Sequence, residues 1–393
     1  MYSNFAYYTP TKVVFGKDTV SQTGALVKEF GGTKVLIHYG SQSAVRSGLL
    51  ERVKNSLDQA GILHVELGGV VPNPHLGKVR EGIELGKQEQ VDFILAVGGG
   101  SVIDSAKAIS LGLANGGDVW DFYIGKRTPS SALPVASVLT IAAAGSEMSD
   151  GSVITDEKQA LKRDCGSDLI RPKFAVMDPQ LTMTLPDYQT ASGCADILMH
   201  MMERYFNQSD NMEVNDAIAE AIMRTVLKYA RILAADPQNY KARAEVMWAG
   251  SLAHNGLTGC GCDGGDWATH NMEHEMGGMF DVTHGAGLAA IWGSWARYVS
   301  HSAPHRFVKF ACNVMDVAPA ANDQQTIELG IQAMENFYRE IKMPTSMKEL
   351  GIAPTQEQIQ VMAASCYQKT GGPTGCVVPL SVEDMVKIYQ MAL

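Results

Sequence analysis

The chain has 393 residues, of which 46% are hydrophobic and 19% are charged, and its formal net charge is −10. A chain of this length can bury a sizeable core and divides into about two domains of the usual ~100–200 residues. The negative charge and the lack of a dense run of lysine and arginine argue against nucleic acid as a partner.

The N-terminal residues 1–16 lack the charged region and the long apolar run of a signal peptide, so we expect a cytosolic protein. The most apolar stretch, residues 133–145, is well short of the ~20 residues that span a bilayer, so we expect no membrane segment. Seven scattered cysteines, an odd number, indicate reduced thiols rather than a disulfide framework.

Short β-branched runs alternate with helical stretches in the first half of the chain. In chain order we expect a first strand at residues 34–39, a helix at 49–60, and further strands at 91–97, 134–141 and 174–177. Strands that are apolar throughout are typical of a parallel sheet covered by helices on both faces. The first domain, residues 1–186, is therefore predicted to be a Rossmann-like α/β domain.

Strand signals nearly vanish after Pro186, and long amphipathic stretches replace them. We expect helices at residues 217–234 and 325–341, and a shorter one at 267–276 that stops at the two glycines that follow it. Residues 187–393 are predicted to form an all-helical domain.

The strand at residues 91–97 runs into a glycine turn, Gly98-Gly99-Gly100-Ser101, and then into a predicted helix. Glycines let the backbone approach a pyrophosphate, and the helix N-terminus behind them offers N–H groups and the positive end of a dipole. We expect this turn to bind a dinucleotide through four residues: Gly99, Gly100, Ser101 and Asp104.

The details of this turn leave a second interpretation open. Ser101 is the expected N-cap of the helix, and Asp104, three residues later, is expected to complete a capping box. Because Ile103 stands where the third glycine of the G-x-G-x-x-G fingerprint belongs, the turn is not an ordinary Rossmann turn. The alternative is a tight, capped turn that binds no ligand.

The strand at residues 34–39 ends in Gly40-Ser41-Gln42-Ser43, where an NAD-selective site often has a carboxylate for the ribose 2′-hydroxyl. No acid is present here. Gly40, Ser41 and Ser43, with Arg46 close behind, leave room and donors for a 2′-phosphate, which favours NADP(H). The alternative is a polar loop without cofactor contact.

Acidic and histidine residues recur with helical spacing in the second half. Asp196 and His200 are four residues apart, so both side chains project from one helix face. His270 and His274 repeat this spacing, and His284 begins another predicted helix. One oxygen and several imidazoles suit a borderline divalent ion such as Fe²⁺ or Zn²⁺. Alternatively, each pair caps a helix or forms a surface ion pair.

Together these motifs resemble those of the iron-containing, or group III, alcohol dehydrogenases, especially the branch of NADPH-dependent butanol dehydrogenases and aldehyde reductases. The resemblance runs the length of the chain. It rests on Gly98-Gly99-Gly100-Ser101-x-x-Asp104-x-x-Lys107, Gly145-Ser146-Glu147, Asp178-Pro179, Asp196-x-x-x-His200, and His270-x-x-x-His274 followed by His284-Gly285. It implies an architecture similar to that of dehydroquinate synthase.

By this resemblance one divalent metal, Fe²⁺ or alternatively Zn²⁺, is held by Asp196, His200, His270 and His284. His274 is then the histidine that faces the active-site cleft without binding the metal. We expect it to relay a proton between the substrate oxygen and solvent, or alternatively to support a ligand.

The resemblance adds three candidate cofactor contacts, namely Asn73 near the nicotinamide, and Thr140 and Lys162 near the ribose and phosphates. Lys158 is an alternative to Lys162 in the same loop. The chain departs from the family at residues 141–144, Ile-Ala-Ala-Ala, where further threonines are usual, and this weakens the contacts expected there.

The predicted function is hydride transfer between nicotinamide C4 and a small alcohol or aldehyde such as butanol or butanal, with the metal polarising the oxygen. We expect a homo-oligomer, a dimer. The alternatives are an enzyme similar to glycerol dehydrogenase or dehydroquinate synthase, and a metal- and nucleotide-binding protein without activity. Against the last, closed structural zinc sites usually contain cysteine, and none of the four expected ligands is one.

Overall fold

The computed structural model describes residues 3–40, 42–209, 212–262 and 264–393. The chain folds into two compact units. One unit comprises Thr9–Leu185, and the other comprises Pro186–Leu393 together with the N-terminal residues up to Tyr8.

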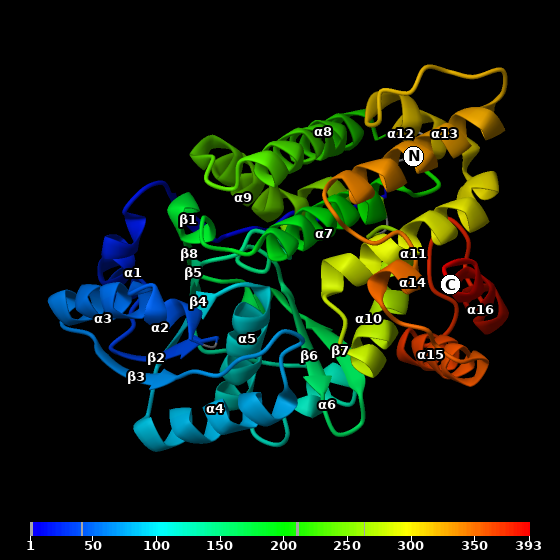
Figure 1. The fold of residues 1–393 in the computed structure, drawn as a ribbon. Coiled ribbons are helices and arrows are strands. Elements are labelled where there is room, and N and C mark those ends of the chain that lie inside the picture. The colour runs from blue at the N-terminus through cyan, green and yellow to red at the C-terminus, as the bar shows by residue number, and fades with distance from the viewer. Residues whose placement is uncertain (1–2, 41, 210–211, 263) are drawn as a thin grey trace. The chain divides into compact units, whose positions relative to one another are not determined.

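The first unit is an α/β unit (Figure 1). Its strands are β1 (Lys12–Phe15), β2 (Lys34–Tyr39), β3 (Leu63–Leu67), β4 (Phe93–Gly98), β5 (Val135–Leu139), β6 (Gly151–Asp156), β7 (Leu161–Gly166) and β8 (Phe174–Met177). Its helices are α1 (Thr23–Glu29), α2 (Ser43–Arg46), α3 (Leu49–Ala60), α4 (Leu76–Glu89), α5 (Gly100–Ala114) and α6 (Trp120–Tyr123).

Six of these strands form one parallel sheet in the order β1-β8-β5-β4-β2-β3, and β6 and β7 form a separate antiparallel hairpin. Every residue of β4, β5 and β8 is buried, as expected for strands that helices cover on both faces. Apolar residues of α1, α3 and the central strands make one core, which burial of apolar surface stabilises. The Rossmann-like sheet predicted from the sequence is confirmed.

The sequence prediction missed β1, β3 and the β6–β7 hairpin. The strand at Lys34–Tyr39 is therefore the second strand of the chain. β1 and β3 lie at the two edges of the sheet, and each is partly exposed, so neither shows a continuous apolar run. Leu161–Gly166 of the hairpin contains Lys, Arg and Asp, which masks its strand character.

The second unit is largely helical, as predicted. Its helices are α7 (Asp187–Tyr205), α8 (Glu213–Ala235), α9 (Tyr240–His254), α10 (Ala268–Phe280), α11 (His284–Val299), α12 (Pro304–Asn313), α13 (Asp323–Glu340), α14 (Met347–Leu350), α15 (Gln356–Lys369) and α16 (Val382–Met391). Among the described residues, no helix is long and apolar enough to cross a membrane.

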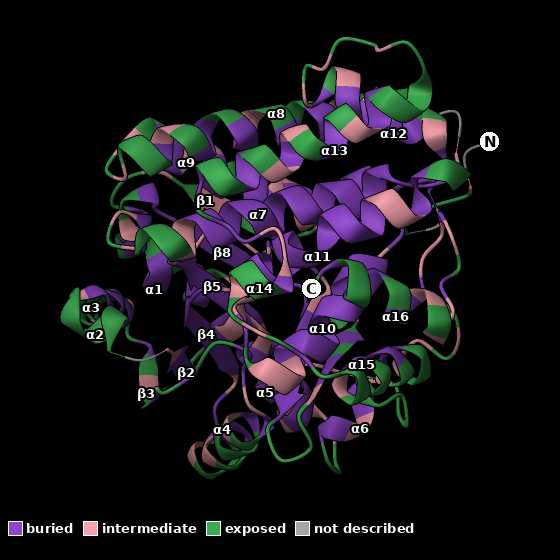
Figure 2. Cartoon of the chain, turned by 45° about the vertical axis from the view of Figure 1, so that its right-hand side comes forward, coloured by how far each residue is buried: buried purple, intermediate pink, exposed green. Residues whose placement is uncertain are grey.

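Two helices of this unit matter for the site. α7 is buried continuously from Ala191 to Tyr205, and Figure 2 shows it and α11 in the colour of buried residues. α10 does not stop at Gly277-Gly278, as the sequence predicted, but continues to Phe280 and ends at Asp281, whose φ of 51 is left-handed. Packing overrides the low helix propensity of these glycines, since Gly277 is buried.

Candidate metal centre and nucleotide site

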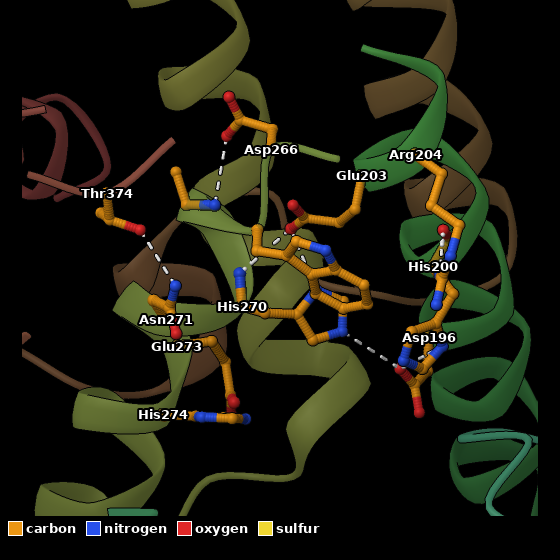
Figure 3. Close-up of polar contacts among 12 residues, drawn as sticks. Asp196, His200, Glu203, Arg204, Asp266, His270, Asn271, Glu273, His274 and Thr374 are labelled. Carbon is orange, nitrogen blue, oxygen red and sulfur yellow. Dashed lines mark hydrogen bonds and ion pairs between the residues drawn. The ribbon is translucent and has the colours of Figure 1, made fainter. Parts of the chain in front are cut away.

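Three helices of the second unit carry the predicted metal ligands. Asp196 and His200 lie one turn apart on α7, and His270 lies on α10 (Figure 3). His284 is the first residue of α11. The first three side chains are buried and His284 is half-buried. All three helices belong to one unit, so its fold alone assembles the cluster.

Gly285 explains how α11 comes so close to α7. A Cβ atom at this position would lie 2.0 Å from the backbone oxygen of Ser192, one turn before Asp196 on α7. Only a residue without a side chain allows this approach, so the glycine that follows His284 brings its imidazole to the carboxylate of Asp196.

The nitrogen atoms of the three histidines surround one oxygen of Asp196. Its Oδ1 lies 3.4 Å from Nδ1 of His200, 3.8 Å from Nε2 of His270 and 3.8 Å from Nε2 of His284. Two ligands each about 2.1 Å from a tetrahedral metal ion are about 3.4 Å apart, so these separations suit a cluster around a small cation.

The buried polar atoms of the cluster support the same conclusion. Asp196 Oδ1, His200 Nδ1 and His270 Nε2 are buried and have no hydrogen-bond partner. Burying such atoms without partners costs several kcal/mol, and a divalent cation would satisfy all three. The residues present therefore fit the metal that the sequence predicts.

His200 differs from the other three ligands in position. Potential ligand atoms of Asp196, His270 and His284 lie within 4.8 Å of one another, whereas His200 is outside this group of three. It joins the cluster through Asp196, and its ring centroid lies 4.7 Å from that of His270. On its other side the ring packs against His254, at 4.1 Å between centroids.

Two glutamates orient the histidines, and the sequence analysis did not identify either. Oε1 of Glu203 accepts from Nδ1 of His270 at 2.9 Å and from its backbone N–H at 3.1 Å. Oε2 of Glu273 pairs with Nδ1 of His284. In both cases the contact leaves Nε2 to face Asp196. A carboxylate behind a histidine fixes its tautomer and makes it a better metal ligand.

The electrostatics of the cluster favour a positive charge. Burial alone would raise the pKa of Asp196, but the surrounding histidines hold it well below its usual range. Burial alone would lower the pKa of His270, but the carboxylates of Asp196 and Glu203 raise it to about 9. The carboxylates thus stabilise a cation in this buried place.

His274 lies next to this cluster. It is buried, and one of its nitrogens lies within 4.8 Å of ligand atoms of Glu273 and His284. Its Nδ1 contacts Nζ of Lys369, on a helix that the sequence analysis did not connect with the site.

The glycine turn of the first unit has the predicted order of strand, turn and helix. The N-cap is Gly99 and α5 begins at Gly100, so the prediction of Ser101 as N-cap and of a capping box with Asp104 is wrong. Glycine is an acceptable N-cap, and Gly99 itself makes no side-chain hydrogen bond to the first N–H groups of this helix.

Asp104 and Lys107 tie the loop before β6 to α5. The Asp104 carboxylate accepts from Oγ of Ser146 and from the N–H of Val153. Nζ of Lys107 donates to oxygens of Ser146, Ser149 and Gly151. Burial lowers the pKa of Lys107 to about 8. These two motif residues hold the loop in place.

Other predicted cofactor residues lie at the carboxyl ends of neighbouring strands. Gly40 follows β2, Gly99 follows β4 and Thr140 follows β5, and these three strands are adjacent in the sheet. Since β2 pairs with both β3 and β4, the strand order reverses between β2 and β4, which is where ligands bind in such sheets. Ser43 begins α2, and Ser41 lies outside the described residues.

Asn73 and Lys162 are both buried. Asn73 has a left-handed φ of 52, an uncommon conformation for a residue other than glycine. Lys162 lies on β7, and its charge acts on Asp104 of the glycine-turn helix. Its alternative, Lys158, is exposed in the turn between β6 and β7.

Comparison with known proteins gives matches along nearly the whole chain. The model for iron-containing alcohol dehydrogenases matches residues 10–179, and the model for the C-terminal part of the Fe-containing alcohol dehydrogenase family matches residues 190–393. The chain is 38% identical over 388 residues to NADH-dependent butanol dehydrogenase A of Clostridium acetobutylicum, covering 98% of this chain and 99% of that protein.

Two further relatives agree. NADPH-dependent aldehyde reductase YqhD of Escherichia coli is 33% identical over 353 residues, which cover 89% of this chain and 90% of that protein. The crystal structure of NADH-dependent butanol dehydrogenase A of Thermotoga maritima has a TM-score of 0.95 at 38% identity, covering 99% of this chain and 98% of that one. The chain therefore belongs to the iron-containing alcohol dehydrogenase family of oxidoreductases, as the motifs indicated.

Proposed function

We propose that this protein is a metal-dependent alcohol dehydrogenase and aldehyde reductase whose metal is held by Asp196, His200, His270 and His284. The observation that carries the proposal is the convergence of three histidine nitrogens on Oδ1 of Asp196, at 3.4 to 3.8 Å, in a buried place. The two carboxylates behind His270 and His284 support it.

A bound divalent cation would supply Lewis acidity at the substrate oxygen, and a bound nicotinamide would supply or accept the hydride. The chain's own residues do the rest. Asp196 would lower the net charge of the occupied site, while Glu203 and Glu273 keep the Nε2 atoms of His270 and His284 directed at Asp196, beside which these residues would hold the cation. His274 is proposed to hold a proton at the substrate oxygen, since it is buried beside His284.

For the cofactor we propose NADP(H). The relatives named above include both NADH-dependent and NADPH-dependent enzymes, so the choice between the two cofactors rests on the residues that follow β2. Residues 40–46, directly after β2, contain no acid, and Ser43 and Arg46 lie there on the short helix α2. A carboxylate placed there would repel a 2′-phosphate and accept from a 2′-hydroxyl.

The substitution Ser43→Asp tests the cofactor proposal. We expect it to lower kcat/KM for NADPH at least about tenfold while leaving kcat/KM for NADH equal or higher, because like charges repel. Ser47→Asp, one turn further on and also exposed, is the matched control. A wild-type enzyme that prefers NADH would overturn this part of the proposal.

The substrate is proposed to be a small aldehyde or alcohol, such as butanal or butanol, in line with the activities for which the relatives are named. The test is an assay of NADPH oxidation with short and branched aldehydes on chelated protein, before and after addition of Fe²⁺ or Zn²⁺. We expect turnover only with metal. Absence of turnover on every aldehyde with metal present would contradict the proposed function.

A further inference from the structure

Lys369, the last residue of α15, contacts the helix that carries His270 and His274. Its Nζ lies 2.7 Å from Nδ1 of His274 and 3.2 Å from Oδ1 of Asn271. Both contacts lie inside the helical unit and join residues 95 and 98 positions apart in the sequence. No motif in the sequence connects Lys369 with the site.

The first contact fixes where His274 carries its proton. An ammonium group has three donors and no acceptor, so Nδ1 of His274 must accept the hydrogen bond. A neutral imidazole carries a single proton, which then sits on Nε2. The ring can therefore donate a hydrogen bond only from the nitrogen that faces away from Lys369.

The second contact holds Lys369 in place. Nδ2 of Asn271 donates to Oγ1 of Thr374 at 2.9 Å (Figure 3). This assignment of the amide directs Oδ1 of Asn271 to Lys369. Thr374 belongs to the segment after α15. The buried carboxylate of Asp266 anchors this segment by accepting from the backbone N–H groups of Cys376 and Val377, at 2.8 and 2.9 Å. Lys369 is thus oriented by a network of hydrogen bonds.

The position of His274 shows what this orientation serves. Its ring centroid lies 5.6 Å from that of His284, a proposed metal ligand. We infer that Lys369 is a positioning residue that holds His274 as its Nε2–H tautomer, so that the ring donates a hydrogen bond to the oxygen of the substrate. This inference rests on the proposed function.

Kinetics provide the first test. Lys369→Met keeps the length and removes the donor, whereas Lys369→Arg keeps a donor. Lys348→Met, at an exposed position of α14, is the matched control. With butanal and NADPH, Lys369→Met should lower kcat at least about tenfold and change KM for butanal much less, since general acid–base groups contribute about 10²–10⁴ to rates. Lys369→Arg should restore most of kcat. Equal kcat for Lys369→Met and Lys348→Met would overturn the inference.

A second test does not depend on activity. Nitrogen NMR of ¹⁵N-histidine-labelled, zinc-loaded protein reports the tautomer of His274. The signals of His274 are assigned as those that are lost in His274→Gln. We expect Nε2–H in the wild type and a shift toward Nδ1–H in Lys369→Met. An unchanged tautomer in Lys369→Met overturns the inference and leaves the proposed function standing. Failure of the wild type to reduce any aldehyde after loading with either Fe²⁺ or Zn²⁺ overturns the proposed function instead, so the two failures are distinguishable.

Discussion

At the scale of single residues, the metal centre is defined as much by the carboxylates behind the histidines as by the ligands. Glu203 accepts from both the side chain and the backbone of His270. Glu203 contributes to the free energy of metal binding by orienting Nε2 of His270 toward Asp196. Glu273 does the same for His284 from within the helix that carries His270.

The substitution Glu203→Gln should weaken metal binding about 10–100-fold while leaving the chain folded, because an amide is a poorer acceptor for the Nδ1 proton of His270. Isothermal titration with Zn²⁺ measures this, with Glu357→Gln on the exposed face of α15 as the control. Unchanged zinc affinity in Glu203→Gln would show that this hydrogen bond does not act on the metal.

The ligand pairs could be predicted from spacing, but most of their partners could not. Four-residue spacing placed Asp196 with His200 on one helix face. Glu203, seven residues after Asp196, continues the same stripe and was the one missed partner with a local signal. Lys369 is 95 residues from His274 and meets it only through the packing of α15 on α10. No local pattern reports such a contact.

At the scale of elements, the site depends on how closely two helices approach. α7 carries Asp196 and α11 begins at His284, and Gly285 lets the start of α11 contact the backbone of α7 at Ser192. Gly287, two residues after Gly285 on α11, leaves room for the Glu273 side chain in the same way.

The substitution Gly285→Ala should destabilise the protein by at least about 1–3 kcal/mol and abolish tight zinc binding, because a methyl group would overlap the backbone of Ser192. Urea unfolding with and without zinc measures both effects. Gly116→Ala is the control, since a Cβ atom there meets no other atom within 4 Å. Wild-type stability and zinc affinity in Gly285→Ala would refute this account of the helix contact.

The elements themselves were predictable where their apolar residues form a clear pattern. The helix at Leu49–Ala60 and the strand at Phe174–Met177 have the predicted bounds, because apolar residues recur with helical spacing in the first and fill the second. The N-cap of α5 was placed at Ser101 because serine is a better cap than glycine, whereas the chain turns into the helix already at Gly99. The half-exposed edge strands gave no comparable signal.

At the scale of the whole molecule, each of the two units contains buried groups whose protonation state matters. The helical unit holds the proposed metal centre, and metal ligands must be deprotonated. The α/β unit contains a fully buried histidine, His38, between β3 and α5. It contacts the backbone oxygen of Leu67 at 3.0 Å and Oγ of Ser105 at 2.8 Å.

Acid should destabilise the protein through His38. Burial lowers its pKa from 6.5 to about 4, so below pH 6.5 the unfolded chain binds a proton that the folded chain does not. The free energy of unfolding should be fully retained above pH 6.5 and fall by about 3 kcal/mol as the pH drops to 4.

Urea unfolding of wild type and His38→Gln at several pH values isolates this contribution as the difference between the two proteins. His301→Gln, at an exposed position, should behave as the wild type does. If wild type and His38→Gln lose stability in parallel between pH 6.5 and 4, the buried histidine is not the cause.

The central claim is that a divalent metal at Asp196 enables aldehyde reduction. Its most direct test is to measure bound metal and NADPH-dependent butanal reduction in the same samples of wild type and Asp196→Ala, after chelation and reloading with Fe²⁺ or Zn²⁺. We predict one metal ion per wild-type chain, none bound tightly by the folded variant, and turnover proportional to bound metal. Turnover by metal-free wild type, or full turnover by Asp196→Ala, would contradict the claim.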